Sequence, residues 1–345
     1  MTGRSGLPLA LLCFVVLIRV ACVGVVPAGA QEDRFVTIST LKCRSLSMGG
    51  ASVAVRDDLG AVNMNPAAID LFATPQTLRF AVFFNPVAPA VAFCRSADLG
   101  PARNEQAIAL AAFVKAIAVT LSPLDLVVSW GEEVPGFGPR QHGPEAFQLR
   151  HFADVFCSSG AVRLRLAPQV ALGAGSTVWH LRQQGHSLWQ AGFSYGVLVQ
   201  PDPRVCVGAV YVELPDSFET ARQPLERIGD ESLNLGFAWH PFSSTMLSAD
   251  LRSVGEEGSL LSRELHVGFE QIVFGHLALR GGAFREKESR SLVYSAGVGL
   301  FDTNAFVSAE KRLAHPAFAV NYALVYRAVS PGPVRWHLLS VLLRL

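Results

Sequence analysis

The feature that most constrains this chain is an alternation of apolar residues with small or polar ones at every second position. Between positions 189 and 200, the odd-numbered residues are Trp, Ala, Phe, Tyr and Val, and the even-numbered ones, Leu198 apart, are Gln, Gly and Ser. A period of two is that of a β-strand with two different faces. The same alternation recurs over residues 233–240, 292–300 and 318–327. Further strand candidates are residues 78–84, 162–166, 170–178, 205–211, 247–251, 265–271, 277–284 and 334–345. The pattern predicts an all-β fold.

Long apolar runs are missing from the sequence. After Gln31 no stretch supplies the roughly 18 to 20 consecutive apolar residues that a membrane-spanning helix needs. The most apolar region, residues 107–130, is interrupted by Lys115, Pro123 and Asp125. Many of the strand candidates, however, have the roughly 9 to 11 residues of a tilted strand that crosses an outer membrane. Only 17% of the residues are charged, against about 25% in soluble proteins. We therefore expect a transmembrane antiparallel β-barrel of about 12 to 16 strands.

Two further patterns favour a membrane barrel over a soluble β-sandwich or a soluble periplasmic β-protein, which would also alternate. Tryptophans stand near strand ends: Trp179 and Trp189 bracket a polar stretch, and Trp130 and Trp239 precede predicted connections. Such positions are typical of an interfacial aromatic girdle. The charged, Pro and Gly residues gather in a few long connections, as in barrels with long loops on one side. These connections are residues 95–106, 131–145, 214–231 and 252–263.

The first thirty residues have the organisation of a secretory signal peptide. Arg4 supplies a positive start, residues 7–26 are mostly apolar, and Ala28-Gly29-Ala30 forms a small-residue cleavage site before Gln31. The alternative is a retained membrane anchor, which Arg19 would interrupt. An exported chain enters a compartment that permits disulfides. Its four remaining cysteines, Cys43, Cys94, Cys157 and Cys206, allow three pairings, and buried free thiols remain an equal alternative.

Several classes of chemistry find no support in the sequence. Lys and Arg total 29 against 28 for Asp and Glu, so there is no basic excess to bind nucleic acid. The cysteines include no C-x-x-C pair for zinc, and metalloprotease and Walker motifs are absent. Residues 192–196 match G-x-S-x-G, the nucleophile elbow of esterases, but they lie inside an alternating strand without a following helix. We expect no enzyme activity, no metal and no cofactor.

Residues 43–71 depart from the alternation and carry a resemblance of their own. They contain, in order, Arg44 before the small-residue cluster Met48-Gly49-Gly50-Ala51, the pair Asp57-Asp58, and Asn65-Pro66-Ala67. In these elements the chain resembles the FadL/TodX family of long-chain fatty-acid transporters. Residues 233–241, 265–270 and 279–282 look like strand motifs of the smaller branch of that family, which includes PorV-type secretion proteins.

The resemblance implies an outer-membrane barrel of about fourteen strands whose lumen is filled by an N-terminal hatch. The implied organisation is a signal peptide (1–30), a hatch or plug (31–75) and the barrel (76–345). Hatch roles carry over to Gly49, Gly50, Asp57, Asp58, Asn65, Pro66 and Ala67. Independently of the family, a glycine pair suits tight packing, and Pro66 after Asn65 favours a turn.

Charged residues also fall on the small or polar faces of several predicted strands, which a barrel would turn toward its lumen. They are Arg163, Arg165, His266, Glu270 and Arg280. Arg163, Arg165 and Arg280 are therefore candidates to bind the carboxylate of a ligand. The alternative is that they pair across the lumen and brace it, because an unpaired buried charge is costly.

The function implied by the resemblance is passive uptake of long-chain fatty acids or other hydrophobic small molecules through the bacterial outer membrane. The partners would be such a ligand and outer-membrane lipid. The alternative is a barrel that transports nothing and serves as a scaffold for secretion, adhesion or assembly, with a surface or secretion partner bound through the long loops. Substrate identity and oligomeric state are not encoded in any pattern that we identify.

Overall fold

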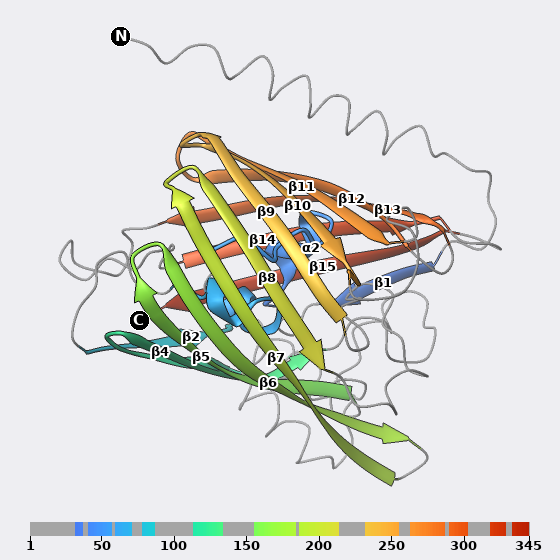
Figure 1. Ribbon diagram of the computed structural model, residues 1–345. Coiled ribbons are helices and arrows are strands. Elements are labelled where there is room, and N and C mark those ends of the chain that lie inside the picture. The colour runs from blue at the N-terminus through green and yellow to red at the C-terminus, as the bar shows by residue number, and fades with distance from the viewer. Residues whose placement is uncertain are drawn as a thin grey trace.

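One sheet accounts for nearly all the regular structure among the residues that the structure describes. The computed structural model describes residues 32–36, 41–56, 59–70, 78–86, 113–133, 155–183, 186–213, 232–254, 263–286, 290–302, 318–328 and 333–344. Within these ranges, fifteen strands form one sheet (Figure 1). The signal-peptide prediction, Cys94 and most of the predicted long connections lie outside the described residues.

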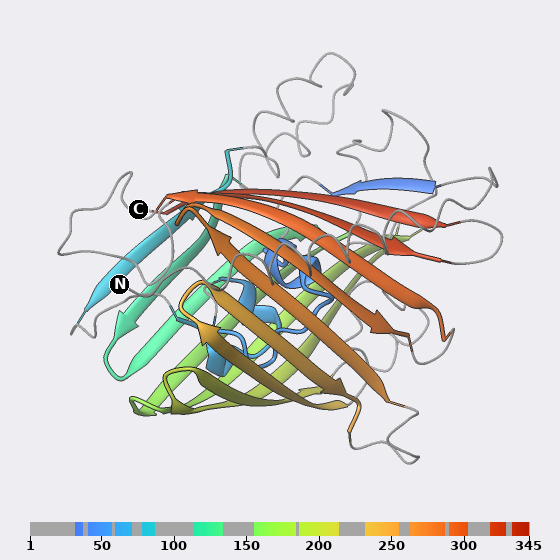
Figure 2. The same ribbon diagram turned by 90° about the horizontal axis from the view of Figure 1, so that it is seen from above.

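The strands follow one another around the sheet in chain order. Their bounds are β1 Glu32–Val36, β2 Arg79–Phe84, β3 Val114–Leu121, β4 Leu124–Glu133, β5 Val155–Ala167, β6 Val170–Gln183, β7 His186–Asp202, β8 Val205–Glu213, β9 Ser232–Phe242, β10 Thr245–Arg252, β11 Glu264–Val273, β12 Leu277–Arg285, β13 Leu292–Asp302, β14 Phe318–Arg327 and β15 Val334–Arg344. Every neighbouring pair from β2 to β15 is antiparallel, and β15 pairs back to β2. Figure 2 shows the strands enclosing an interior. The predicted all-β antiparallel barrel of about fourteen strands is confirmed.

The closure between β15 and β2 is staggered. Only two residue pairs join these strands, Leu343 with Phe84 and Arg344 with Phe83. Further along the same edge, the first half of β15 pairs in parallel with β1, from Glu32 opposite Val334 to Val36 opposite Leu338. The seam of the barrel is therefore completed by a strand that precedes the barrel in the chain. The sequence pattern did not indicate β1.

Alternation along each strand separates an apolar outer face from an inner face. On β7, Trp189, Phe193 and Tyr195 are exposed, whereas Gly192 and Gly196 between them are buried. On β9, Leu233, Leu235, Phe237 and Trp239 are 37–46% exposed, and the residues between them face inward. A belt of outward Leu, Val, Phe, Tyr and Trp side chains continues over β3 to β14. Such a belt suits contact with lipid chains, and its phase is the one that the alternation predicts.

The most apolar region of the sequence folds into two strands, and the residues that interrupt it explain why. Lys115 and Asp125 point inward, where the Lys115 ammonium donates to the Trp130 carbonyl at 3.0 Å and Asp125 accepts from the Thr120 hydroxyl at 2.6 Å. Pro123 lies in the turn between β3 and β4. Of the three residues that interrupt the apolar region, Lys115 and Asp125 occupy inward positions of strands, and Pro123 occupies a turn.

The two ends of the barrel differ in their connections. At one end, named here the short-turn end, residues 122–123, 168–169, 203–204, 243–244 and 274–276 join successive strands. The predicted connections 95–106 and 214–231 lie outside the described residues, as do residues 303–317 between β13 and β14. No helix within the described ranges is long and apolar enough to cross a bilayer.

Three of the four cysteines that follow Gln31 are free and buried thiols: Cys43, Cys157 and Cys206. For these three cysteines, the alternative of buried free thiols holds and not that of disulfides. Cys43 lies inside the barrel, where its thiol donates to the Leu338 carbonyl at 3.7 Å. Burial raises the pKa of the Cys43 thiol to about 12, so the group stays protonated and inert at neutral pH.

Candidate functional site

The segment from Leu41 to Asp70 lies inside the barrel and is named here the inner segment. It contains the helix α2 (Cys43–Ser47) and two short 3-10 helices, η1 (Leu59–Asn63) and η2 (Pro66–Ala68). Figure 2 shows these helices surrounded by the strands. Of its described residues, all are buried except Arg44, Arg56, Asn63 and Asp70, which are partly exposed. Asp57 and Asp58 lie outside the described residues.

Local sequence explains two turns of the inner segment. Asn65 caps η2, because its side-chain oxygen accepts from the Ala67 amide at 3.1 Å, and Pro66 takes the first helical position, where no amide hydrogen is needed. Gly49 and Gly50 follow α2 with φ angles of 67° and 76°. This left-handed conformation favours glycine, and it turns the chain after the helix.

The barrel wall is shaped to receive the inner segment at backbone distance. A Cβ atom added to Gly173 on β6 would overlap the Ala67 amide, and one added to Gly282 on β12 would overlap the Met48 carbonyl group. Similar overlaps would arise at Gly196, Gly208, Gly236, Gly268 and Gly297. The small residues of the alternating pattern therefore leave room for the inner segment to contact the backbone of the barrel wall.

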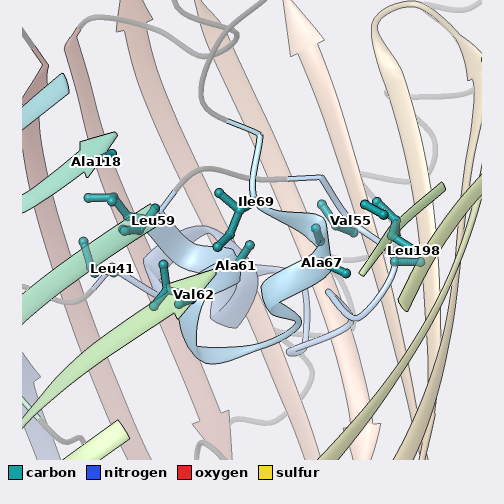
Figure 3. Close-up of a cluster of buried hydrophobic side chains, with 14 of the residues drawn as sticks. Leu41, Val55, Leu59, Ala61, Val62, Ala67, Ile69, Ala118 and Leu198 are labelled. Carbon is teal, nitrogen blue, oxygen red and sulfur yellow. The ribbon is translucent and has the colours of Figure 1, made fainter. Parts of the chain in front are cut away.

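One half of the inner segment, residues 59–69, is held mainly by apolar packing. Figure 3 shows Leu59, Ala61, Val62, Ala67 and Ile69 together with wall residues. All five are at most 3% exposed. Their wall neighbours in the same cluster include Ala118 on β3 and Leu198 on β7. We name residues 59–69 the apolar half.

The other half, residues 43–53, is held by polar side chains of the wall that bind its backbone. The Asp250 carboxylate accepts from the Ser52 and Val53 amides at 2.7 and 3.0 Å. The Arg252 guanidinium donates to the Gly50 carbonyl at 2.7 Å, and the His266 ring is 2.6 Å from the Gly49 carbonyl. Ser295 accepts from the Gly49 amide and donates to the Ser47 carbonyl. We name residues 43–53 the polar half.

Glu270 on β11 fastens the polar half through charge. Both of its oxygens accept from Arg44 of α2, at 2.7 and 3.0 Å, and one also accepts from Arg280 of β12 at 2.6 Å. Arg280 extends the network to the Asn321 side chain on β14 at 2.7 Å. Bidentate pairs of this kind are the strongest ionic contacts in proteins.

A second ionic group lies where the inner segment ends. Asp70 contacts Arg56 at 2.7 Å and Arg163 at 3.7 Å. Arg163 also lies 3.5 Å from Asp125, which Arg165 approaches at 3.3 Å. Asp70 and Asp125 are therefore each shared by two guanidinium groups, as Glu270 is.

A cavity of about 280 Å³ opens between the inner segment and the wall at the short-turn end. The inner segment contributes Arg44, Arg56 and Asp70. The wall contributes residues from the β7–β8, β9–β10 and β11–β12 hairpins, among them Gln200, His240 and Thr245. The three partly exposed charged residues of the inner segment thus all line one cavity.

The structure places most of the predicted site residues together. Gly49, Gly50, Asn65, Pro66 and Ala67 all lie in the buried inner segment. Arg163 and Arg280 point inward from opposite sides of the interior, and the less buried Arg165 adjoins Arg163, all three with carboxylate partners. Whether any of them contacts a ligand stays a prediction.

Sequence reasoning missed several residues that hold the inner segment. Asp250, Arg252 and Ser295 escaped notice, as did Glu132, which accepts from the Leu41 amide at 3.1 Å and the Asn63 side chain at 2.7 Å. The signal was present for β10, because Ser248, Asp250 and Arg252 occupy the polar phase of an alternating strand. Within the described ranges, no group of three His, Cys, Asp or Glu residues is arranged to hold a metal ion.

Comparison with known proteins finds similar solved structures but no similar sequences among family models or curated proteins. No protein-family model matches the chain, and no curated protein matches it. Among solved structures, the CymD monoaromatic hydrocarbon channel is 11% identical, with coverage of 87% of this chain and 94% of that one and a TM-score of 0.45. A deletion mutant of the TodX monoaromatic hydrocarbon channel is 11% identical over 87% and 96%, with a TM-score of 0.43. A porin mutant of Rhodopseudomonas blastica is 10% identical over 67% and 76%, with a TM-score of 0.33.

Proposed function

We propose that this chain is a passive channel of the bacterial outer membrane for hydrophobic small molecules, with long-chain fatty acids as the first class to test. In this proposal residues 31–75 form a hatch. Of its described residues, the inner segment fills the lumen, whereas β1 joins the seam of the barrel. The observation that carries the proposal is a closed barrel with an apolar outer belt and a lumen filled by a separately held segment. An inner segment that is held by contacts of its own can move aside, as a gated passage requires.

The two kinds of contact on the inner segment support a hatch that moves in part. The polar half is bound by hydrogen bonds and ion pairs, which water can replace one by one when the segment shifts. The apolar half is held by buried apolar side chains, and its withdrawal would expose apolar surface. The proposed passage therefore runs along the β10–β13 side, past residues 43–53.

The ligand in this mechanism would enter from the end with the long connections, pass the displaced polar half and leave at the short-turn end. No covalent step and no cofactor is involved. Arg163, Arg165 and Arg280 remain proposed contacts for a ligand carboxylate. Each would have to give up part of an existing ion pair to make that contact, which favours the bracing role for the resting state.

A scaffold without transport is the second candidate, and the wall glycines favour it. Close packing of backbone on backbone around Ala67 and Met48 suits a permanent filling at least as well as a gate. A scaffold would bind its partner through the connections opposite the short-turn end. Its hatch would stay in place under all conditions.

Reconstituted protein distinguishes the two. The full chain, extracted in mild detergent, is first shown to be folded by heat-modifiable gel mobility, and its Trp fluorescence is titrated with a long-chain fatty acid. In liposomes, a channel should give saturable uptake of the fatty acid or of toluene, with low ion conductance. Deletion of residues 31–75 should turn the gated path into a leaky pore, and so should deletion of residues 41–70 alone, which keeps β1 in the seam. A folded barrel that neither binds nor transports, or whose conductance survives the deletion unchanged, would favour the scaffold.

A further inference from the structure

The cavity at the short-turn end has a composition that the hatch role does not explain. A hatch needs contacts that hold it, but here charged groups of the inner segment border open space. Arg44, Arg56 and Asp70 line the cavity together with Glu270 of the wall. A volume of about 280 Å³ is just below the ~300 Å³ at which small-molecule pockets usually begin. The cavity therefore suits a small ligand.

The cavity is lined by two guanidinium groups, Arg44 and Arg56, and by two carboxylates, Asp70 and Glu270. The ionic groups to which these residues belong carry a positive excess, which Arg163, Arg165 and Arg280 supply from outside the lining. The two ionic groups contain five guanidinium groups and three carboxylates, and each carboxylate is already shared by two guanidinium groups. The carboxylates that adjoin the cavity are thus neutralised. The excess charge is positive, so the field in the cavity favours an anion.

Arg56 is the guanidinium best placed to meet such an anion. One of its terminal nitrogens is 2.7 Å from Asp70, and the other donates to the Gln200 side chain at 2.9 Å. Its Nε has no hydrogen-bond partner, although it is buried. The side chain as a whole is 38% exposed. Arg56 thus borders the cavity with a partly exposed side chain, while its unpartnered Nε lies buried behind that surface.

Apolar residues complete the lining beside these charges. Pro203, Met246 and Ile272 come from three neighbouring hairpins, and Ser244 and Thr245 add hydroxyl groups. A bare inorganic anion would leave the apolar surface without a partner. An organic anion with a short alkyl part would cover it and gain from its burial.

We propose that the cavity between Arg56 and the β7–β12 hairpins is a binding site for small organic monocarboxylates. The guanidinium of Arg56 binds the carboxylate, and Met246, Ile272 and Pro203 contact the alkyl part. The site goes beyond the proposed channel function and does not require it, because it lies on the short-turn side of the inner segment and can be filled in a resting channel or in a scaffold.

Calorimetry on the folded full chain in detergent tests the site without any transport. The probes are butanoate and 1-butanol, which share the alkyl chain and differ in charge. Butanoate should bind at one site per chain, and butanol should give only a nonsaturable signal. The Arg56→Gln variant should weaken butanoate binding about tenfold, the loss expected when a charge-assisted hydrogen bond is removed.

A second variant separates binding from hatch stability. Asp70→Asn removes the carboxylate that competes for Arg56, so it should tighten butanoate binding about threefold, whereas damage to the hatch would weaken it. Arg285→Gln, at an exposed residue at the far end of β12, is the matched control and should change nothing. The proposal is overturned if the folded chain does not bind butanoate, if both Arg56→Gln and Asp70→Asn weaken binding, or if inorganic phosphate binds more tightly than butanoate.

Discussion

The polar half and the apolar half of the inner segment contact the same barrel by opposite means. Residues 43–53 meet β10, β11 and β13 through Asp250, Arg252, His266 and Ser295, which bind their backbone groups. Residues 59–69 meet the β3–β7 side mainly through apolar side chains, with Asn63 bound to Glu132 as an exception. Wall glycines contact both halves, so the halves differ in their polar contacts and not in the glycine lining. If the inner segment moves as proposed, water can replace the hydrogen bonds of the polar half one by one. Any opening should therefore begin in the polar half.

The largest effect is expected where the apolar half touches the wall. Gly173→Ala puts a methyl group against the Ala67 backbone, which cannot yield without moving η2. We expect a loss of about 1–3 kcal/mol in the free energy of unfolding. The measurement is the temperature at which the folded barrel shifts to the gel mobility of the unfolded chain, which should be lower in the variant. Gly160→Ala on the neighbouring β5 is the control, because its Cβ would meet only the Val127 carbonyl at 3.8 Å. Equal melting of the two variants would mean that the apolar half is loosely held.

The next effect belongs to the polar half. Asp250→Ala leaves the Ser52 and Val53 amides without their acceptor, and each unsatisfied buried donor costs about 1–3 kcal/mol unless water replaces the carboxylate. If the polar half is exchangeable, water will enter, and the variant will show faster hydrogen exchange at these amides and a higher ion conductance with little change in melting. Ser248→Ala on the same strand is the control, since the buried Ser248 hydroxyl has no hydrogen-bond partner. A much lower melting temperature of Asp250→Ala, without a higher ion conductance, would contradict the distinction between the polar half and the apolar half.

A smaller effect should reveal how the halves are coupled. Asn65 of η2 donates to the Val53 carbonyl at 2.7 Å and so connects the two halves. Asn65→Ala should cost about 0.5–2 kcal/mol, the usual loss for a cap. Combined with Asp250→Ala, it should act nonadditively, because both changes release Val53. Additive melting shifts in the double variant would show that the halves respond independently.

The smallest effect is expected at Arg163. Its contacts with Asp125 and Asp70, at 3.5 and 3.7 Å, are long for ion pairs. As a brace, Arg163→Gln leaves Asp70 paired with Arg56 and Asp125 paired with Arg165, so no buried carboxylate loses its last partner. Melting should therefore change by about 1 kcal/mol, and binding of a long-chain fatty acid and its methyl ester should be affected equally. Stronger weakening for the acid than for the ester would restore the carboxylate role of Arg163.

The two-residue alternation of the sequence predicted which residues of a strand face outward and which face inward. The phase of β7, β9, β13 and β14 follows from alternation alone, and so does the inward position of Arg163 and Arg280. Which inward groups meet was beyond such reasoning, because a contact such as Asp250 to Ser52 depends on the register of β10 and on the path of a distant segment. The strand β1 was missed because its five residues are too few for a pattern, and its partner is the last strand of the chain. Lys115 and Asp125 were read as interruptions, since a sequence does not distinguish a break in a strand from a charge that faces inward.

The staggered seam also sets the order in which the molecule is built. Glu32 and Val334 are far apart in the sequence, and their pairing closes the longest loop of any strand pair in the described sheet. Contacts so distant in sequence form slowly, so closure should be the final step of assembly. The inner segment is enclosed on all sides once the seam has formed, and it is therefore wrapped by a curling sheet rather than threaded into a finished one. Until that step, the free edges of β2 and β15 need protection from pairing with other chains.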